Sequence, residues 1–71
     1  MIQADTQKLR TERISRGLNL EDVARGADIH TATYCRIENG LSRPRPKTAK
    51  RICDFLNRPF SELFELIDKE E

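Results

Sequence analysis

The chain has 71 residues, of which 37% are hydrophobic and 35% charged, and a formal net charge of +1. This length supports one domain near the lower limit for folding without metals or disulfides, so we expect a single compact domain spanning residues 1–71. No more than two apolar residues follow one another, which argues against a membrane-spanning segment or a signal peptide. We therefore expect a cytoplasmic protein without membrane contact.

The first predicted helix follows residues 1–4, which we expect to be frayed. Asp5 or Thr6 can cap this helix, because both side chains can accept a hydrogen bond from a free backbone N–H group. The helix runs to about Arg16, and Gly17 is suited to the left-handed conformation that ends many helices.

Residues 20–39, LEDVARGADIHTATYCRIEN, predict two short amphipathic helices joined by a tight turn. Asn19 can cap the first of them, with Asp22 completing a capping box. Asp28 lies in the turn, where we expect a positive φ. The second helix covers about residues 31–39. The side chains expected on the inner faces of the pair are Val23, Ala24, Ala27, Ile29, Thr33, Tyr34 and Ile37.

Two further helices are predicted after a basic loop over residues 41–45. Pro46 fits the first turn of the fourth helix, and Asn57 can end it in a left-handed conformation. Pro59 then opens the fifth helix. The side chains expected to face inward are Ala49, Ile52, Cys53 and Leu56 in the fourth helix and Phe60, Leu63, Phe64 and Ile67 in the fifth. Because no strand pattern is recognisable, we predict an all-α chain folded as a compact five-helix bundle.

Charge is distributed unevenly along the chain. Residues 36–58 carry seven basic and two acidic side chains, a net charge of +5. Residues 62–71 form an acidic C-terminal end with five acids and one lysine, a net charge of −4. This pattern favours a basic face directed at phosphates and an acidic end directed away from them. Two unrelated solvated faces are the alternative.

Catalysis and metal binding have little support in the sequence. Cys35 and Cys53 are too few for a disulfide framework, so we expect reduced thiols, with Cys53 in the core; a redox-sensing pair is the alternative. The single histidine, His30, is five residues from Cys35. The two side chains should differ by about 140° around a helix, so they form no catalytic dyad. We expect no enzyme, no metal, no cofactor and no small-molecule ligand.

Five segments in order, RGLNLEDVA, ADI, RIENG, RPRP and FLNRPFSELF, resemble the phage-repressor (XRE or Cro-type) helix-turn-helix family over about residues 8–65. The resemblance implies a lambda-repressor-like DNA-binding domain in which the second and third helices form the helix-turn-helix. It implies a sequence-specific transcriptional regulator, in most cases a repressor, that binds double-stranded DNA as a homodimer with its third helix in the major groove.

By position in the family motif, Thr31, Ala32 and Arg36 would read bases. Arginine can bind guanine O6 and N7, and an alanine can contact a thymine methyl group. The phosphate contacts implied by the same motif are Asn19, His30, Asn39, Arg43 and Arg45. His30 stands where the family usually has serine or threonine. If it touches a phosphate, DNA affinity should rise on acidification, whereas an exposed histidine without a role is the alternative.

The first predicted helix directs an arginine toward the interior, because Leu9 and Arg13 are four residues apart and share one face. In the family a helix-one arginine pairs with the glutamate of the RIENG segment, here Glu38. The resemblance therefore implies a partly buried structural ion pair between Arg13 and Glu38 that ties the first helix to the third.

Self-association is expected through the fifth helix. Leu66 and Ile67 exceed what a small core needs, and we assign Leu63, Leu66 and Ile67 to a two-fold dimer surface. The alternative function is an antitoxin-like or adaptor protein-interaction module on the same fold, motivated by Leu20, Ala32 and Tyr34. The basic RPRP loop and Arg36 argue against that alternative.

Overall fold

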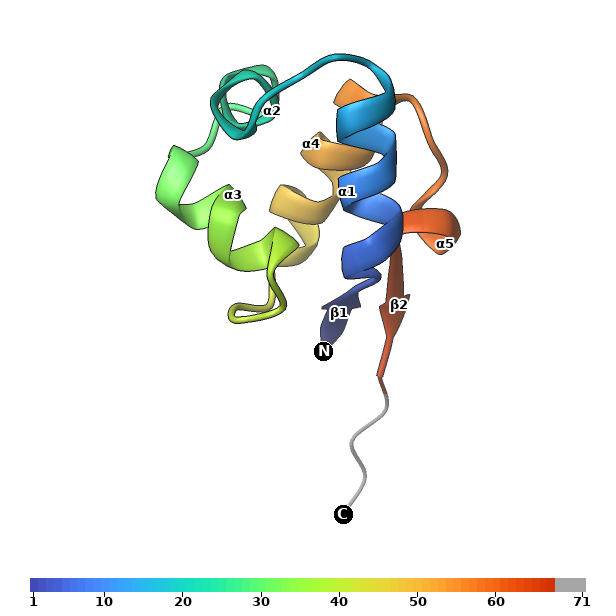
Figure 1. Ribbon diagram of the computed structural model, residues 1–71. Coiled ribbons are helices and arrows are strands. Elements are labelled where there is room, and N and C mark those ends of the chain that lie inside the picture. The colour runs from blue at the N-terminus through green and yellow to red at the C-terminus, as the bar shows by residue number, and fades with distance from the viewer. Residues whose placement is uncertain (68–71) are drawn as a thin grey trace.

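The computed structural model describes residues 1–67, which form five helices and a two-stranded sheet (Figure 1). The elements in chain order are β1 (Ile2–Ala4), α1 (Thr6–Ser15), α2 (Leu20–Gly26), α3 (Thr31–Glu38), α4 (Pro46–Leu56), α5 (Phe60–Leu63) and β2 (Phe64–Leu66). The last four residues of the acidic end predicted over 62–71 lie outside the described residues.

Local capping signals set the bounds of the first two helices as predicted. The Asp5 carboxylate accepts a hydrogen bond of 3.1 Å from the backbone N–H of Lys8, and Gly17 follows α1 with a φ of 71°. At the start of α2, the Asn19 side chain accepts from the Asp22 N–H at 2.8 Å, and the Asp22 carboxylate accepts from the Asn19 N–H at 2.9 Å. These bonds satisfy N–H groups that a helix start otherwise leaves free.

Positive φ values occur where the sequence places residues that tolerate them. Asp28 has a φ of 60° in the turn between α2 and α3, and Asn57 has a φ of 56° at the end of α4. Aspartate and asparagine are the non-glycine residues that adopt this conformation most readily. The sharp turn that separates α2 from α3 is therefore built into the sequence.

The two strands show that the all-α prediction is wrong at both ends of the described chain. β1 pairs with β2 in antiparallel register, with Ile2 opposite Leu66 and Ala4 opposite Phe64. Residues 1–4 are thus not frayed, and Ile2 is only 5% exposed. The fifth helix stops at Leu63 instead of continuing through Ile67. Pairing with the distant N-terminal segment supplies the backbone hydrogen bonds that a longer helix would otherwise make.

The core lies between the helices and the inner face of the sheet. Its buried residues come from every described helix and from both strands: Ile2, Leu9, Val23, Ala24, Ala27, Tyr34, Ile37, Ala49, Ile52, Cys53, Leu56, Leu63 and Phe64. Most of the predicted inner-face residues of the helix pair and of α4 are among them. The exceptions are Ile29, which is half-buried in the turn and packs against the core, and Thr33, which is exposed, so the buried side of α3 is narrower than predicted.

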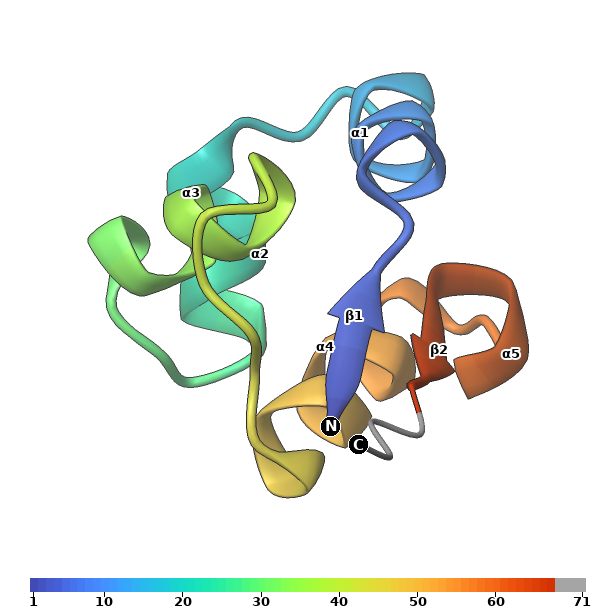
Figure 2. The same cartoon turned by 90° about the horizontal axis from the view of Figure 1, so that it is seen from below.

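The sheet joins the two ends of the described chain beside the basic loop between α3 and α4. Figure 2 shows β1 lying between this loop and β2. A hydrogen bond of 2.8 Å from the Ile67 N–H to the Met1 carbonyl extends the ladder at one end, and one from Asp5 to Leu63 extends it at the other. None of the helices described here is both long and apolar enough to cross a membrane.

Candidate nucleic-acid interface

Helix α3 has one buried side and one exposed side. Tyr34 and Ile37 are buried against the neighbouring helices, α1 and α2. The three side chains expected to read bases, Thr31, Ala32 and Arg36, are all exposed. The structure thus places these residues on the outward side of α3, where a duplex could reach them.

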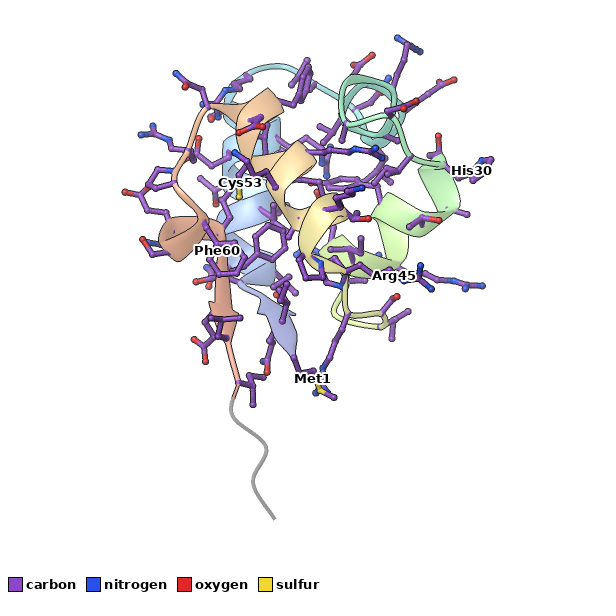
Figure 3. The ribbon with its side chains drawn as sticks, turned by 180° about the vertical axis from the view of Figure 1, so that it is seen from behind. Met1, His30, Arg45, Cys53 and Phe60 are labelled. Carbon is purple, nitrogen blue, oxygen red and sulfur yellow. The ribbon has the colours of Figure 1, made fainter. Side chains whose placement is uncertain are left out.

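The basic loop is held in place by a proline between two arginines. Pro44 is buried, whereas Arg43 and Arg45 on either side of it are exposed. Figure 3 shows His30, at the start of α3, and Arg45, at the start of α4, on the same side of the molecule. Arg43 instead lies toward the chain's N-terminus, where its guanidinium contacts the Met1 thioether. The loop therefore presents its two arginines at different places along one flank.

A buried polar network fixes α3 against α1. The Arg13 Nε donates to Glu38 Oε2 at 2.8 Å and its Nη2 donates to Oε1 at 2.9 Å, while its Nη1 donates to the Leu18 carbonyl at 3.0 Å. The Tyr34 hydroxyl also donates to Glu38 Oε2, at 2.8 Å. The Glu38 side chain is 3% exposed and that of Arg13 is 13% exposed. Arg13 and Glu38 thus form an ion pair with two parallel hydrogen bonds, which joins α1 to α3.

The same contacts shift the proton affinities of the groups around Glu38. The hydrogen bond to Glu38 raises the pKa of Arg13 against the opposing effect of its burial. Burial raises the pKa of Tyr34 far above its usual value, and the hydrogen bond to Glu38 adds to this effect. Both donors therefore keep their protons in the folded chain at neutral pH.

Arg10 is a residue that the sequence analysis missed. Its Nη2 donates to the Asn39 side-chain oxygen at 3.1 Å, and its Nε lies 3.8 Å from Glu38 Oε1. Asn39 in turn donates from Nδ2 to the Cys35 carbonyl at 2.9 Å. Arg10 is three residues before Arg13, a spacing that places both on one helix face and could have indicated it.

Asn19 and Asn39, both predicted to contact phosphates, differ in which polar groups remain free of bonds within the chain. The Asn19 oxygen and backbone N–H are used in the capping box of α2, so its Nδ2 is the group left for a phosphate. The Asn39 amide is held between Arg10 and α3, at the end of the helix. His30 is the N-cap of α3 but makes no side-chain cap bond, so its imidazole does not occupy the N–H groups at that helix start.

The residues assigned to a dimer surface are not equivalent. Leu63 is fully buried in the core of the same chain, so its assignment to that surface is wrong. Leu66, by contrast, is 72% exposed, and Ile67 is half-buried. The difference arises because α5 ends at Leu63 and the following residues leave the helix as a strand.

The cysteines and the carboxylates of the described residues can be compared with the arrangements of reactive thiols and metal ligands. Cys35 and Cys53 are free thiols, and burial raises the pKa of Cys53, which disfavours its thiolate. Within residues 1–67, no three histidine, cysteine or carboxylate side chains are grouped as metal ligands.

The HTH_3 helix-turn-helix family model matches residues 9–63. The chain belongs to this family. The match confirms the resemblance to XRE-type helix-turn-helix proteins and includes α2, α3, the turn between them and the basic loop.

Two relatives of this HTH_3 chain are regulators by name. It is 34% identical over 58 residues to the cryptic phage CTXphi transcriptional repressor RstR of Vibrio cholerae, covering 82% of this chain and 52% of the repressor. It is 34% identical over 62 residues to the uncharacterized HTH-type transcriptional regulator YqaF of Bacillus subtilis (strain 168), covering 87% of this chain and 82% of YqaF.

A solved structure has the same fold. The crystal structure of an HTH_3 family transcriptional regulator from Vibrio cholerae matches with a TM-score of 0.72 and 33% sequence identity, over 80% of this chain and 32% of that chain. The HTH_3 chain therefore spans about half the length of RstR and about a third of the solved regulator.

Proposed function

We propose that this HTH_3 chain is a sequence-specific double-stranded-DNA-binding transcriptional regulator, acting as a repressor with α3 in the major groove. The observation that carries the proposal is the exposed side of α3, which lies beside exposed cations while its acid, Glu38, is turned inward and paired with Arg13. A phosphate backbone approaching α3 would therefore meet cations and not the Glu38 carboxylate. The names of RstR and YqaF agree with this role.

Base readout would come from the first two turns of α3. Arg36 can bind guanine O6 and N7 through two parallel hydrogen bonds, and the Thr31 hydroxyl can donate or accept. Ala32 can contact only a thymine methyl group, so part of the specificity would come from apolar contact or from DNA shape. Cys35 is half-buried on the same helix, so only part of its side chain could contact the DNA.

Phosphate contacts would surround this readout. His30 and Arg45 are exposed on one side, and Arg43 extends the cationic flank along the loop. At Asn39 a phosphate would have to replace the contact of Nδ2 with Cys35 Sγ at 3.4 Å, because Arg10 and the Cys35 carbonyl already hold the rest of its amide. The contact assigned to Asn19 is the weakest, since Glu21 and Asp22 bring negative charge to the same helix start.

A dimer would allow two copies of α3 to read half-sites about one helical turn, roughly 34 Å, apart. One recognition helix touches few base pairs, so pairing increases both affinity and the length of sequence that is read. A regulator of this kind would repress by occupying an operator that overlaps a promoter.

Random-site selection on duplex DNA, followed by binding measurements on variants, tests this proposal. Arg36→Ala should cost about 1–3 kcal/mol at one base pair and relax specificity there. Arg43→Ala should weaken binding to all sequences and reduce the salt dependence of log K by a slope of about 0.9, the value for one phosphate contact.

Arg58→Ala is the matched control for these substitutions. Arg58 belongs to the segment between α4 and α5, and it pairs with Glu12 of α1 at 3.3 Å. Figure 1 shows this segment on the side of the molecule away from α3. This variant should bind DNA like the parent. Salt-independent binding, or Arg36→Ala and Arg43→Ala variants that bind like the parent, would contradict the proposal and favour a protein-interaction module.

A further inference from the structure

The C-terminal end of α3 carries a cation that the family motif does not assign to DNA. Figure 1 shows this end of α3 pointing toward α1, the helix that contains Arg10. The Arg10 Nη2 donates to the Asn39 side-chain oxygen at 3.1 Å, and the Arg10 side chain is still 47% exposed. An arginine has several N–H donors, and within residues 1–67 Arg10 forms a hydrogen bond only with Asn39. Arg10 therefore keeps donors free at the exposed end of α3.

Glu38 is already paired with Arg13 and leaves the charge of Arg10 unbalanced. The two Glu38 oxygens accept hydrogen bonds from Arg13 at 2.8 and 2.9 Å, and the Tyr34 hydroxyl supplies another. The Arg10 Nε lies 3.8 Å from Glu38 Oε1, which is too far for a hydrogen bond. Arg10, Arg13 and Glu38 together thus have one positive charge in excess, and Arg10 is the exposed member of the three.

The Asn39 amide has less capacity to bind a phosphate than the family motif implies. Its oxygen accepts from Arg10, and its Nδ2 donates to the Cys35 carbonyl at 2.9 Å and contacts Cys35 Sγ at 3.4 Å. The C-terminal end of a helix also carries partial negative charge, which disfavours an anion there. A phosphate at this end of α3 therefore requires a cation, and Arg10 is the cation bonded to Asn39.

We propose that Arg10 binds a DNA phosphate at the end of α3, and that Asn39 orients the Arg10 guanidinium toward it. The inference rests on the proposed function, because it adds a contact to the same interface. The hydrogen bond to Asn39 fixes one edge of the planar guanidinium, whose remaining N–H groups suit the geometry of a phosphate. The two arginines on this face of α1 then have separate roles: Arg13 holds α3 through Glu38, and Arg10 binds the DNA backbone.

The salt dependence of DNA binding distinguishes a phosphate contact from a purely structural role. Each phosphate neutralised by a protein cation contributes about 0.9 to the slope of log K against log salt. Arg10→Gln keeps an amide donor for Asn39 but removes the charge, so for a duplex obtained by random-site selection the slope should fall by about 0.9. Over a tenfold rise in salt, the parent should then lose about eightfold more affinity than the variant. Arg10→Lys should retain the slope of the parent.

Asn39→Ala separates the role of Arg10 from that of its partner. This substitution removes no charge, so it should leave the slope unchanged and weaken binding by the same factor at every salt concentration. If Arg10 acted only by holding Asn39 in place, Arg10→Gln and Asn39→Ala would weaken binding to the same extent, and neither would change the slope. That result would overturn the inference.

Lys8→Gln is the matched control, because it removes one positive charge from the same helix. Lys8 is two residues before Arg10, about 200° around the helix, and it lines a hollow with Glu12 and Glu62. This variant should keep the slope of the parent. An equal fall in slope for Lys8→Gln and Arg10→Gln would report net charge alone and overturn the inference.

The parent chain separates failure of the inference from failure of the proposed function. A parent that binds no duplex contradicts the proposed function itself. A parent that binds duplex DNA with a steep salt dependence, which Arg10→Gln leaves unchanged, contradicts the inference alone.

Discussion

Replacing Glu38 with glutamine tests how helix α3 is held against α1. The substitution keeps the shape of the side chain but removes the charge that three donors share. Arg13 would then remain charged at a site where its side chain is only 13% exposed. The carboxamide retains one oxygen acceptor, which cannot serve Arg13 on both prongs and Tyr34 at the same time.

The expected loss of stability is about 3 kcal/mol, at the low end of the 3–5 kcal/mol for removing one partner of a buried ion pair. The low end applies because one acceptor survives and because Arg13 keeps its bond to the Leu18 carbonyl. A chain of 71 residues has a total unfolding free energy of about 4–10 kcal/mol. Glu38→Gln should therefore remove a large part of the stability and lower the midpoint of thermal unfolding markedly.

Urea unfolding followed by circular dichroism gives the free energy directly. Asp54→Asn makes the same chemical change at the surface, where Asp54 is 65% exposed and pairs with Lys50 at 3.2 Å. This control should lose less than about 0.5 kcal/mol. Glu38→Gln could instead lose no more unfolding free energy than Asp54→Asn. The charge of Glu38 would then add nothing to stability, and the reasoning from a buried ion pair would be refuted.

Three further predictions concern single positions. The pKa of Tyr34 is higher in the folded than in the unfolded chain, so the contribution of Tyr34 to stability should be complete below about pH 10 and decline as the pH rises above it. Tyr34 is the only tyrosine of the sequence and tryptophan is absent, so ultraviolet absorbance reports on this residue alone. The absorbance should show tyrosinate only when the chain unfolds. Asn57→Ala should destabilise by about 1 kcal/mol in chemical unfolding, whereas Asn57→Gly should not, since position 57 has a φ of 56°. Gly26→Ala should destabilise the parent, because the new Cβ would lie 2.2 Å from the Phe55 ring. In a Phe55→Ala background the same substitution should stabilise the chain by up to about 1 kcal/mol through helix propensity. An effect of the same sign in both backgrounds would contradict this explanation.

The four longer helices could be predicted because their signals are local. Asn19 with Asp22, Pro46 and Asn57 each act within one turn of chain, and each has the role in the structure that its residue type indicates. Apolar spacing likewise placed Ile52 in the core without any knowledge of its neighbours. The fold family followed from several such segments occurring in order.

The strands and the exposure of the C-terminal apolar residues could not be predicted in this way. β1 and β2 are three residues each, too short to show alternation, and their pairing joins positions 64 residues apart, Ile2 and Leu66. The spacing of Phe60, Leu63, Phe64 and Ile67 matches one face of a helix, but the segment changes from helix to strand after Leu63. The helical spacing therefore predicted a longer helix than the chain forms. Which of these side chains is buried depends on where residues 2–4 lie, which is a property of the whole fold.

The arrangement around Glu38 explains why this chain keeps a buried charge where an apolar contact would pack as well. Among the eight residues of α3, the buried ones are Tyr34, Ile37 and Glu38, so apolar burial alone constrains the rotation of this helix only weakly. Hydrogen bonds are directional, and those on Glu38 come from Arg13 on α1 and from Tyr34 on α3 itself. Arg10 extends the same constraint to Asn39 at the end of the helix. A buried ion pair contributes little net stability relative to apolar residues of the same volume, so we infer that this pair serves to fix the rotation of α3 against α1.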